Sequence, residues 1–148
     1  MAVDENAVWN IVHITLSKHR ASAGCCGPVC DAWQDLYNVR NFSSSPYPAD
    51  ALAIAEHYLY ARCKVCSGEV SQTQMRAMVR GYDWAKRVAP DGIMRSNPNN
   101  PTTAPTEEEV SWGLKGADDG EADRVRCNPT SDPPKLVVPK FFKSKYSY

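Results

Sequence analysis

The placement of the cysteines is the feature that most constrains the fold of this chain. Five of the six cysteines form two tight clusters, Cys25-Cys26-x₃-Cys30 and Cys63-x₂-Cys66, while Cys127 lies far downstream. Sulfur atoms can be linked, or can share a metal ion, only where the fold brings them within a few ångströms of one another. The two clusters therefore restrict how the elements that carry them can be arranged.

Apolar spacing predicts four helices in residues 1–89. Asp4 is suited to cap the first helix, Ser71 and Gln74 form a capping-box pattern at the start of the fourth, and Pro90 ends it. The predicted helices cover about residues 5–20, from Pro28 to the loop that begins at Asn41, residues 49–66 and residues 71–89. The apolar side of the second helix holds Val29, Trp33, Leu36 and Tyr37.

Residues 90–148 have a different character, because eight of the 11 prolines lie there and little periodicity is present. A second capping-box pattern from Thr106 to Glu109 predicts one short helix through Trp112, which the glycines of residues 113–120 are expected to break. The acidic residues that follow are expected to form a solvated loop. Residues 136–138 are apolar and mostly β-branched, which predicts at most a single edge strand between prolines.

The predicted fold class is therefore mainly α, in one domain. Residues 1–89 form a four-helix antiparallel bundle-like core, and residues 90–148 form an irregular proline-rich extension that packs on the core or acts as a binding arm. A short connection between the second and third helices indicates an antiparallel hairpin. In that hairpin Cys26 and Cys30 would face Cys63 and Cys66.

Three interpretations of the cysteines remain open. The one that we favour narrowly is disulfide bonding among Cys25, Cys26, Cys30, Cys63, Cys66 and Cys127, with Cys127 tying the extension to Cys25 or Cys26. The second is a metal site, such as structural zinc, that uses Cys26, Cys30, Cys63 and Cys66 as ligands. The third is that the cysteines are buried thiols, which pack as small apolar side chains. No other cofactor is predicted.

One catalytic hypothesis deserves a test. A cysteine in the first turn of a helix has a lowered thiol pKa, so Cys30 could act as a nucleophile with His57 as its base. No third residue that would orient the histidine can be identified, and the sequence has no phosphate-binding glycine motif. Catalysis is therefore the alternative and not the leading hypothesis.

Charge and hydropathy argue against two classes of binding partner, nucleic acid and the membrane interior. The formal net charge is zero, which argues against nucleic-acid binding, and no apolar run reaches the length of a membrane span. The N-terminus has no secretory signal pattern, which leaves the cytoplasm or a signal-independent export route.

The sequence thus favours a small soluble, non-enzymatic interaction protein of bacterial or phage type. Two segments are candidates for contact with a protein partner: the basic face of the fourth helix and a basic, aromatic arm near the C-terminus. Their residues are Arg76, Arg80 and Arg87 in the helix, and Lys140, Phe141, Phe142 and Lys143 in the arm. The alternative is an effector or toxin exported without a signal, possessing a Cys-His hydrolase site at Cys30 and His57.

Overall fold

The computed structural model describes residues 3–19, 27–79 and 107–127, and these residues are mainly helical. Four helices have full bounds: α1 (Glu5–His19), α2 (Gly27–Phe42), α3 (Ala49–Cys66) and α5 (Glu107–Cys127). Residues 72–79 are helical as well, and no strand occurs among the residues described. The prediction of a mainly α fold with helices packed on one another is confirmed.

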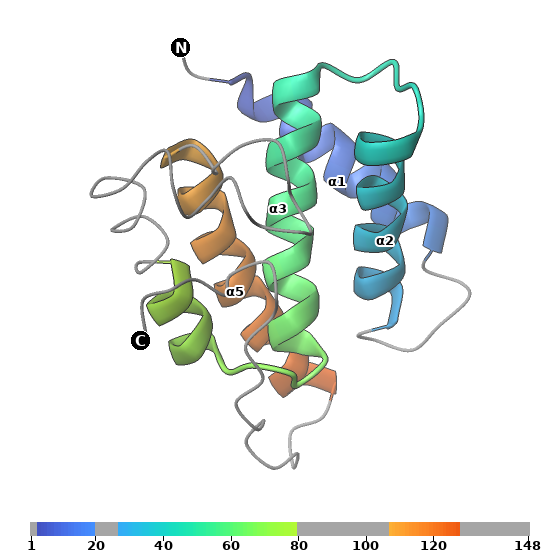
Figure 1. Cartoon of the computed structure of the whole chain (residues 1–148). Helices are drawn as coiled ribbons and strands as arrows, with labels where there is room; N and C mark the ends of the chain where they lie inside the picture. Colours follow the sequence, from blue (N-terminus) through green and yellow to red (C-terminus); the bar gives the residue numbers. More distant parts are fainter. Residues whose placement is uncertain (1–2, 20–26, 80–106, 128–148) are drawn as a thin grey trace.

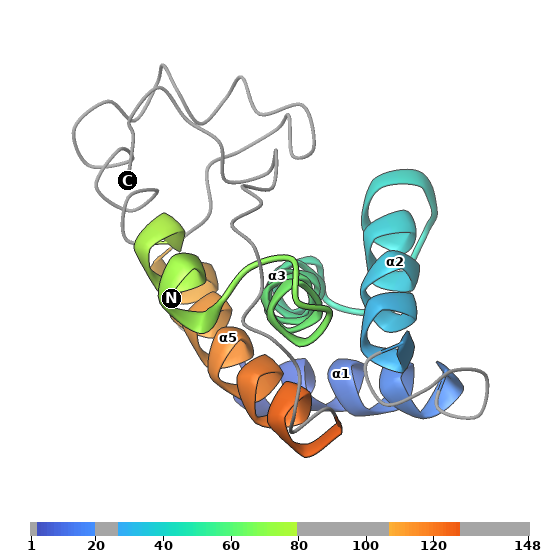
Figure 2. The same ribbon diagram turned by 90° about the horizontal axis from the view of Figure 1, so that it is seen from below.

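Helix α3 lies at the centre of the molecule (Figure 1). Seen along its axis, α2 and α5 lie on opposite sides of it and α1 crosses a third side (Figure 2). Helices α2 and α3 run in opposite directions, as the predicted hairpin requires, whereas α5 runs parallel to α3. The second long partner of α3 is thus α5, a helix from the region that was predicted to be irregular.

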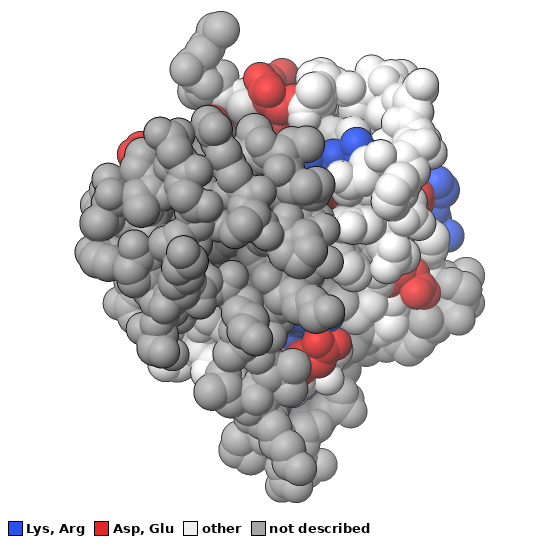
Figure 3. Space-filling model, in the orientation of Figure 1, with Lys and Arg blue, Asp and Glu red and all other residues white. Residues whose placement is uncertain are grey.

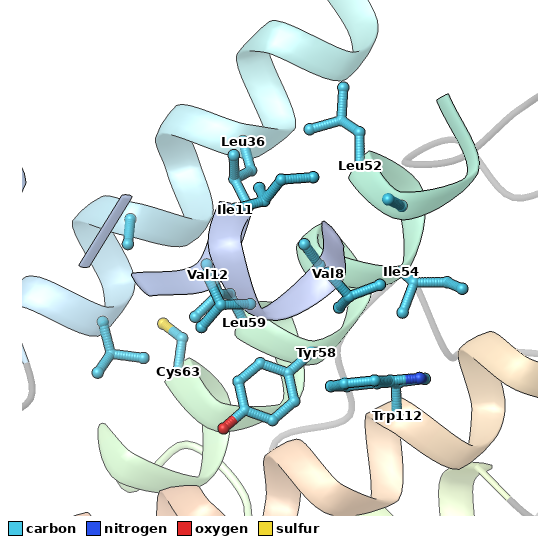
Figure 4. Close-up of a cluster of buried hydrophobic side chains, with 14 residues drawn as sticks. Val8, Ile11, Val12, Leu36, Leu52, Ile54, Tyr58, Leu59, Cys63 and Trp112 are labelled. Carbon is cyan, nitrogen blue, oxygen red and sulfur yellow. The ribbon is translucent and has the colours of Figure 1, made fainter. Parts of the chain in front are cut away.

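The main core cluster takes side chains from all four helices (Figure 4). Val8, Ile11 and Val12 of α1 meet Leu36 of α2 and Leu59 of α3, and all five are at most 2% exposed. Trp112 of α5 closes the cluster and lies edge-on to Tyr58, with ring centroids 5.8 Å apart. Helix α3 buries 13 of its 18 residues, so it is covered on most of its sides.

The predicted helix starts are confirmed where the structure describes them. The side chain of Asp4 accepts a hydrogen bond from the backbone N–H of Asn6 at 3.0 Å and so caps α1. In the helix that starts after Ser71, the Gln74 N–H donates to Ser71 Oγ at 3.1 Å, and the Ser71 N–H donates to Gln74 Oε1 at 2.8 Å. This reciprocal pair is the capping box that the sequence predicts.

The prediction of a short helix that ends near Trp112 is wrong. Helix α5 extends from Glu107 through Gly113, Gly116 and Gly120 to Cys127. The three glycines are spaced three and four residues apart, which places them on one side of the helix. That side packs against α3: a Cβ atom added at Gly120 would lie 2.6 Å from the carbonyl oxygen of Arg62. The glycines therefore allow two helix backbones to approach closely instead of ending the helix.

The expected acidic loop is also incorrect, because the carboxylates belong to α5 and several are paired across helices. Tyr58 donates a hydrogen bond to Asp119, and Arg62 Nε donates to Asp123 at 2.8 Å. Asp118 accepts hydrogen bonds from Gln72 and Arg76 in the 72–79 helix. These contacts fix α5 to two other helices. Together they offset part of the free-energy cost of placing glycines inside a helix.

Several predictions fall outside the described residues. They concern the end of the fourth helix (residues 80–89), the irregular segment before α5, the edge strand at residues 136–138 and the C-terminal arm. Within the described part of the chain, no helix is sufficiently long and apolar to cross a membrane.

Candidate binding site

The start of α2 and the end of α3 are joined by a disulfide between Cys30 and Cys63. Their Cα atoms lie 4.9 Å apart, within the usual range for a disulfide. This is the contact that the predicted hairpin required of one cysteine from each cluster. Because Cys30 and Cys63 are 33 positions apart in sequence, the bond closes the whole α2–α3 hairpin.

Cys66 is disulfide-bonded too, so none of the cysteines described in the structure is a free thiol. The pairing of Cys25, Cys26 and Cys127 lies outside the described side chains. The disulfide interpretation thus applies to Cys30, Cys63 and Cys66. The described residues contain no group of His, Cys, Asp or Glu that could hold a metal ion, and Cys26 of the four-cysteine site lies beyond them.

The structure does not bring Cys30 and His57 together. Cys30 is bonded to Cys63, and in this form it carries no thiol that could act as a nucleophile. His57 lies six residues before Cys63 on α3, about 9 Å along the helix axis. Its ring faces α5, since a Cβ atom added at Gly113 would lie 2.9 Å from His57 Cδ2. The two residues therefore lie on different sides of α3.

His57 has a clear electrostatic role in stability. The residue is completely buried, and burial, followed by the charge of Arg40, lowers the pKa of its ring to about 3. In the unfolded chain, histidine takes up a proton near pH 6.5. The folded state resists this protonation, so the free energy of unfolding must fall as the pH drops below about 6.5.

We expect the free energy of unfolding to fall by about 2 kcal/mol between pH 7 and pH 5 because of His57 alone. Urea titrations of the wild type and of His57→Gln at both pH values isolate this effect, since all other titrating groups are shared. His57→Gln should lose that part of the pH dependence, while His13→Gln, at an exposed position on α1, should keep it. Equal slopes for wild type and His57→Gln would disprove the assignment.

The residues predicted to contact a partner are only partly described. Arg76 forms an ion pair with Asp118 of α5 and is 40% exposed, so part of its charge serves the fold. Arg80, Arg87 and the arm residues 140–143 lie outside the described residues.

Four aromatic rings form a row that reaches from the interior to the surface, which we call the ring row: Phe42, Tyr37 and Trp33 of α2, and Tyr60 of α3. The ring centroids are 6.2 Å apart between Phe42 and Tyr37, 5.5 Å between Tyr37 and Trp33, and 5.1 Å between Trp33 and Tyr60. These spacings are typical of stabilising aromatic pairs. Each ring therefore restricts the orientation of its neighbour.

Exposure increases along the ring row. Tyr60 is 4% exposed, Trp33 and Tyr37 are half-buried, and Phe42 at the last residue of α2 is 75% exposed. The amine of Lys64 lies 5.6 Å from the centroid of Trp33 and 5.5 Å from that of Tyr60, which are cation–π distances. The buried end of the row is thus anchored on α3, and the open end presents an apolar ring to solvent.

A buried ion pair fixes the middle of the ring row. Glu56 of α3 is 2% exposed; it accepts a hydrogen bond from Trp33 Nε1 at 2.9 Å and one from Arg40 at 2.6 Å. Burial raises the pKa of the Glu56 carboxyl, although the charge of Arg40 and both hydrogen bonds act in the opposite direction. Trp33 therefore has its indole N–H satisfied and its ring held in one orientation.

Sequence patterning did not identify this surface. It assigned Trp33 and Tyr37 to an apolar helix face and placed Phe42 in a loop. It could not place Tyr60 beside Trp33, because only the packing of α2 on α3 brings these two rings together. The signal that could have found it is the spacing of Trp33 and Tyr37, four residues apart on one side of a helix that also carries Arg40. No family model, curated protein or solved structure matches the chain.

Proposed function

We propose that this chain acts by binding a protein partner through the ring row, and not by catalysis. The observation that carries the proposal is the exposed ring of Phe42 at the end of a row whose other members are held in place. Trp, Tyr and Arg dominate the binding energy of protein interfaces, and rings that are already ordered lose little conformational entropy when they bind. Trp33, Tyr37 and Arg40 supply these residue types beside Phe42.

The charge distribution of the described surface also supports a protein as the partner. Figure 3 shows one side of the molecule, where the described surface is mainly uncharged and its basic and acidic atoms form small separate groups. Such a surface suits apolar and hydrogen-bonding contacts better than long-range attraction of a polyanion. An oxidising compartment is part of the proposal, because disulfides such as Cys30–Cys63 persist in oxidising surroundings.

Site-specific photo-crosslinking tests the proposal directly. Benzoylphenylalanine is incorporated at position 42 and, as a matched control, at position 14, because Ile14 is an exposed apolar residue of α1 (49%) away from the ring row. We expect illumination of cells that produce the protein to give one discrete adduct with another protein from position 42 and none from position 14.

The other outcomes contradict the proposal. Equal adducts from both positions would indicate unspecific apolar contact, adducts with a second copy of the chain would indicate self-association, and no adduct would remove the ring row as an interface. With the purified partner, Phe42→Ala should weaken binding at least tenfold, as expected for the centre of an interface. Ile14→Ala should change the affinity less than twofold.

A further inference from the structure

A cavity of about 350 Å³ lies where the starts of α1 and α5 meet, away from the ring row. Its lining residues are Val3, Glu5, Glu108, Ser111, Trp112 and Lys115. The Val3 N–H donates hydrogen bonds to both carboxylate oxygens of Glu108, at 3.1 and 3.2 Å, and this contact holds the two helix starts together. The volume is within the range of small-molecule sites.

One lining residue, Lys115, already places a cation over two indole rings, of which Trp112 also lines the cavity. The amine of Lys115 lies 4.6 Å from the ring centroid of Trp9 and 5.1 Å from that of Trp112. The two indole rings are 4.8 Å apart and inclined at 62°, so both faces can be presented to a single positive charge. Trp112 is only 8% exposed and packs in the core, which makes this arrangement rigid.

The charges around the cavity favour a cation as well. Glu5 and Glu108 place two carboxylates on its wall, against the single ammonium of Lys115. Both glutamates lie in the first turns of their helices, where the helix dipole favours negative charge. Lys115 is exposed and its side chain is long and flexible, so its amine can move away from the rings without disturbing the core.

From this geometry we infer that the cavity binds a small organic cation whose ammonium group takes the place of the Lys115 amine over Trp9 and Trp112. The apolar part of the ligand would occupy the space beside Val3, and the carboxylates of Glu5 and Glu108 would balance its charge. Lys115 is then an internal competitor that occupies the rings when no ligand is present. This inference is independent of the ring row and of a protein partner.

Choline serves as the probe, and its uncharged isostere 3,3-dimethyl-1-butanol serves as the matched ligand control. The indole N–H signals of ¹⁵N-labelled protein are followed during titration with each compound. We expect saturable shifts of the Trp9 and Trp112 signals with choline and at least fivefold weaker binding of the neutral compound. Equal binding of both compounds, or no saturable shift with choline, would overturn the inference.

Removal of the internal competitor supplies the sharper test. Lys115→Met keeps an unbranched apolar stem like that of lysine but removes the ammonium group, and it should tighten choline binding about three- to fivefold. Lys18→Met makes the same change of charge at an exposed position where α1 meets α2 and should leave the affinity unchanged. If Lys115→Met does not bind more tightly, or if Lys18→Met gives the same gain, Lys115 does not compete for the rings and the inference fails.

Discussion

Gly116→Ala should destabilise the protein by about 3 kcal/mol, although alanine is the better helix former by about 1 kcal/mol. An added Cβ atom would fall well within 3.0 Å of the carbonyl oxygen of Tyr58, and 3.2 Å from the Cβ atom of Ala61. The atom that it meets is backbone, so no side-chain rotation can relieve the clash. Helices α3 and α5 would have to move apart, which would strain the pairs formed by Asp119 and Asp123.

Urea unfolding followed by circular dichroism measures this effect. Gly120→Ala should behave in the same way, since its Cβ atom would lie 2.6 Å from the carbonyl oxygen of Arg62. Ser111→Ala, at an exposed position of the same helix, is the control and should be neutral or slightly stabilising. If Gly116→Ala were stabilising, the close approach of α5 to α3 would be refuted.

The same glycines explain why α5 could not be predicted at its full length. Helices α1, α2 and α3 can be predicted from local sequence signals, such as the cap Asp4 and apolar residues at helical spacing. Glycine, by contrast, lowers helix propensity, and only the backbone of α3 makes its lack of a side chain useful. That benefit is a tertiary property. Arg62 and its partner Asp123 are 61 positions apart, and nothing local in either segment indicates the pair.

Helix α3 shows a second limit of patterning. The predicted apolar stripe of the third helix explains its contacts with α1 and α2, yet α3 also buries Glu56, His57 and Tyr60. A helix that is covered on most sides has no single polar face, so periodicity cannot tell which residue meets which neighbour. The sequence could therefore predict the antiparallel hairpin and the meeting of Cys30 with Cys63, but not the ring row or the cavity beside Trp112.

Removal of the disulfide that closes the α2–α3 hairpin should also lower the stability of the protein strongly. We expect the double variant Cys30→Ala/Cys63→Ala to lose about 4 kcal/mol of stability, the value that the chain-entropy model gives for a closed loop of this length. Without the bond, the unfolded chain gains freedom over the whole α2–α3 segment. Phe42 is the last residue of α2, 12 positions after Cys30 and about 18 Å along the helix axis, so the bond acts on the ring row only through the packing of α2 on α3.

Urea titrations of the oxidised wild type, the oxidised double variant and the reduced wild type separate the contribution of the Cys30–Cys63 bond to stability from that of the other disulfide bonding. Reduction also opens the disulfide of Cys66, so the reduced wild type should be less stable than the double variant. A double variant within about 1 kcal/mol of the oxidised wild type would mean that the Cys30–Cys63 bond contributes far less than loop closure predicts. Because the double variant removes both sulfurs of this pair, neither position leaves an unpaired thiol behind, and the loss can be assigned to this one cross-link.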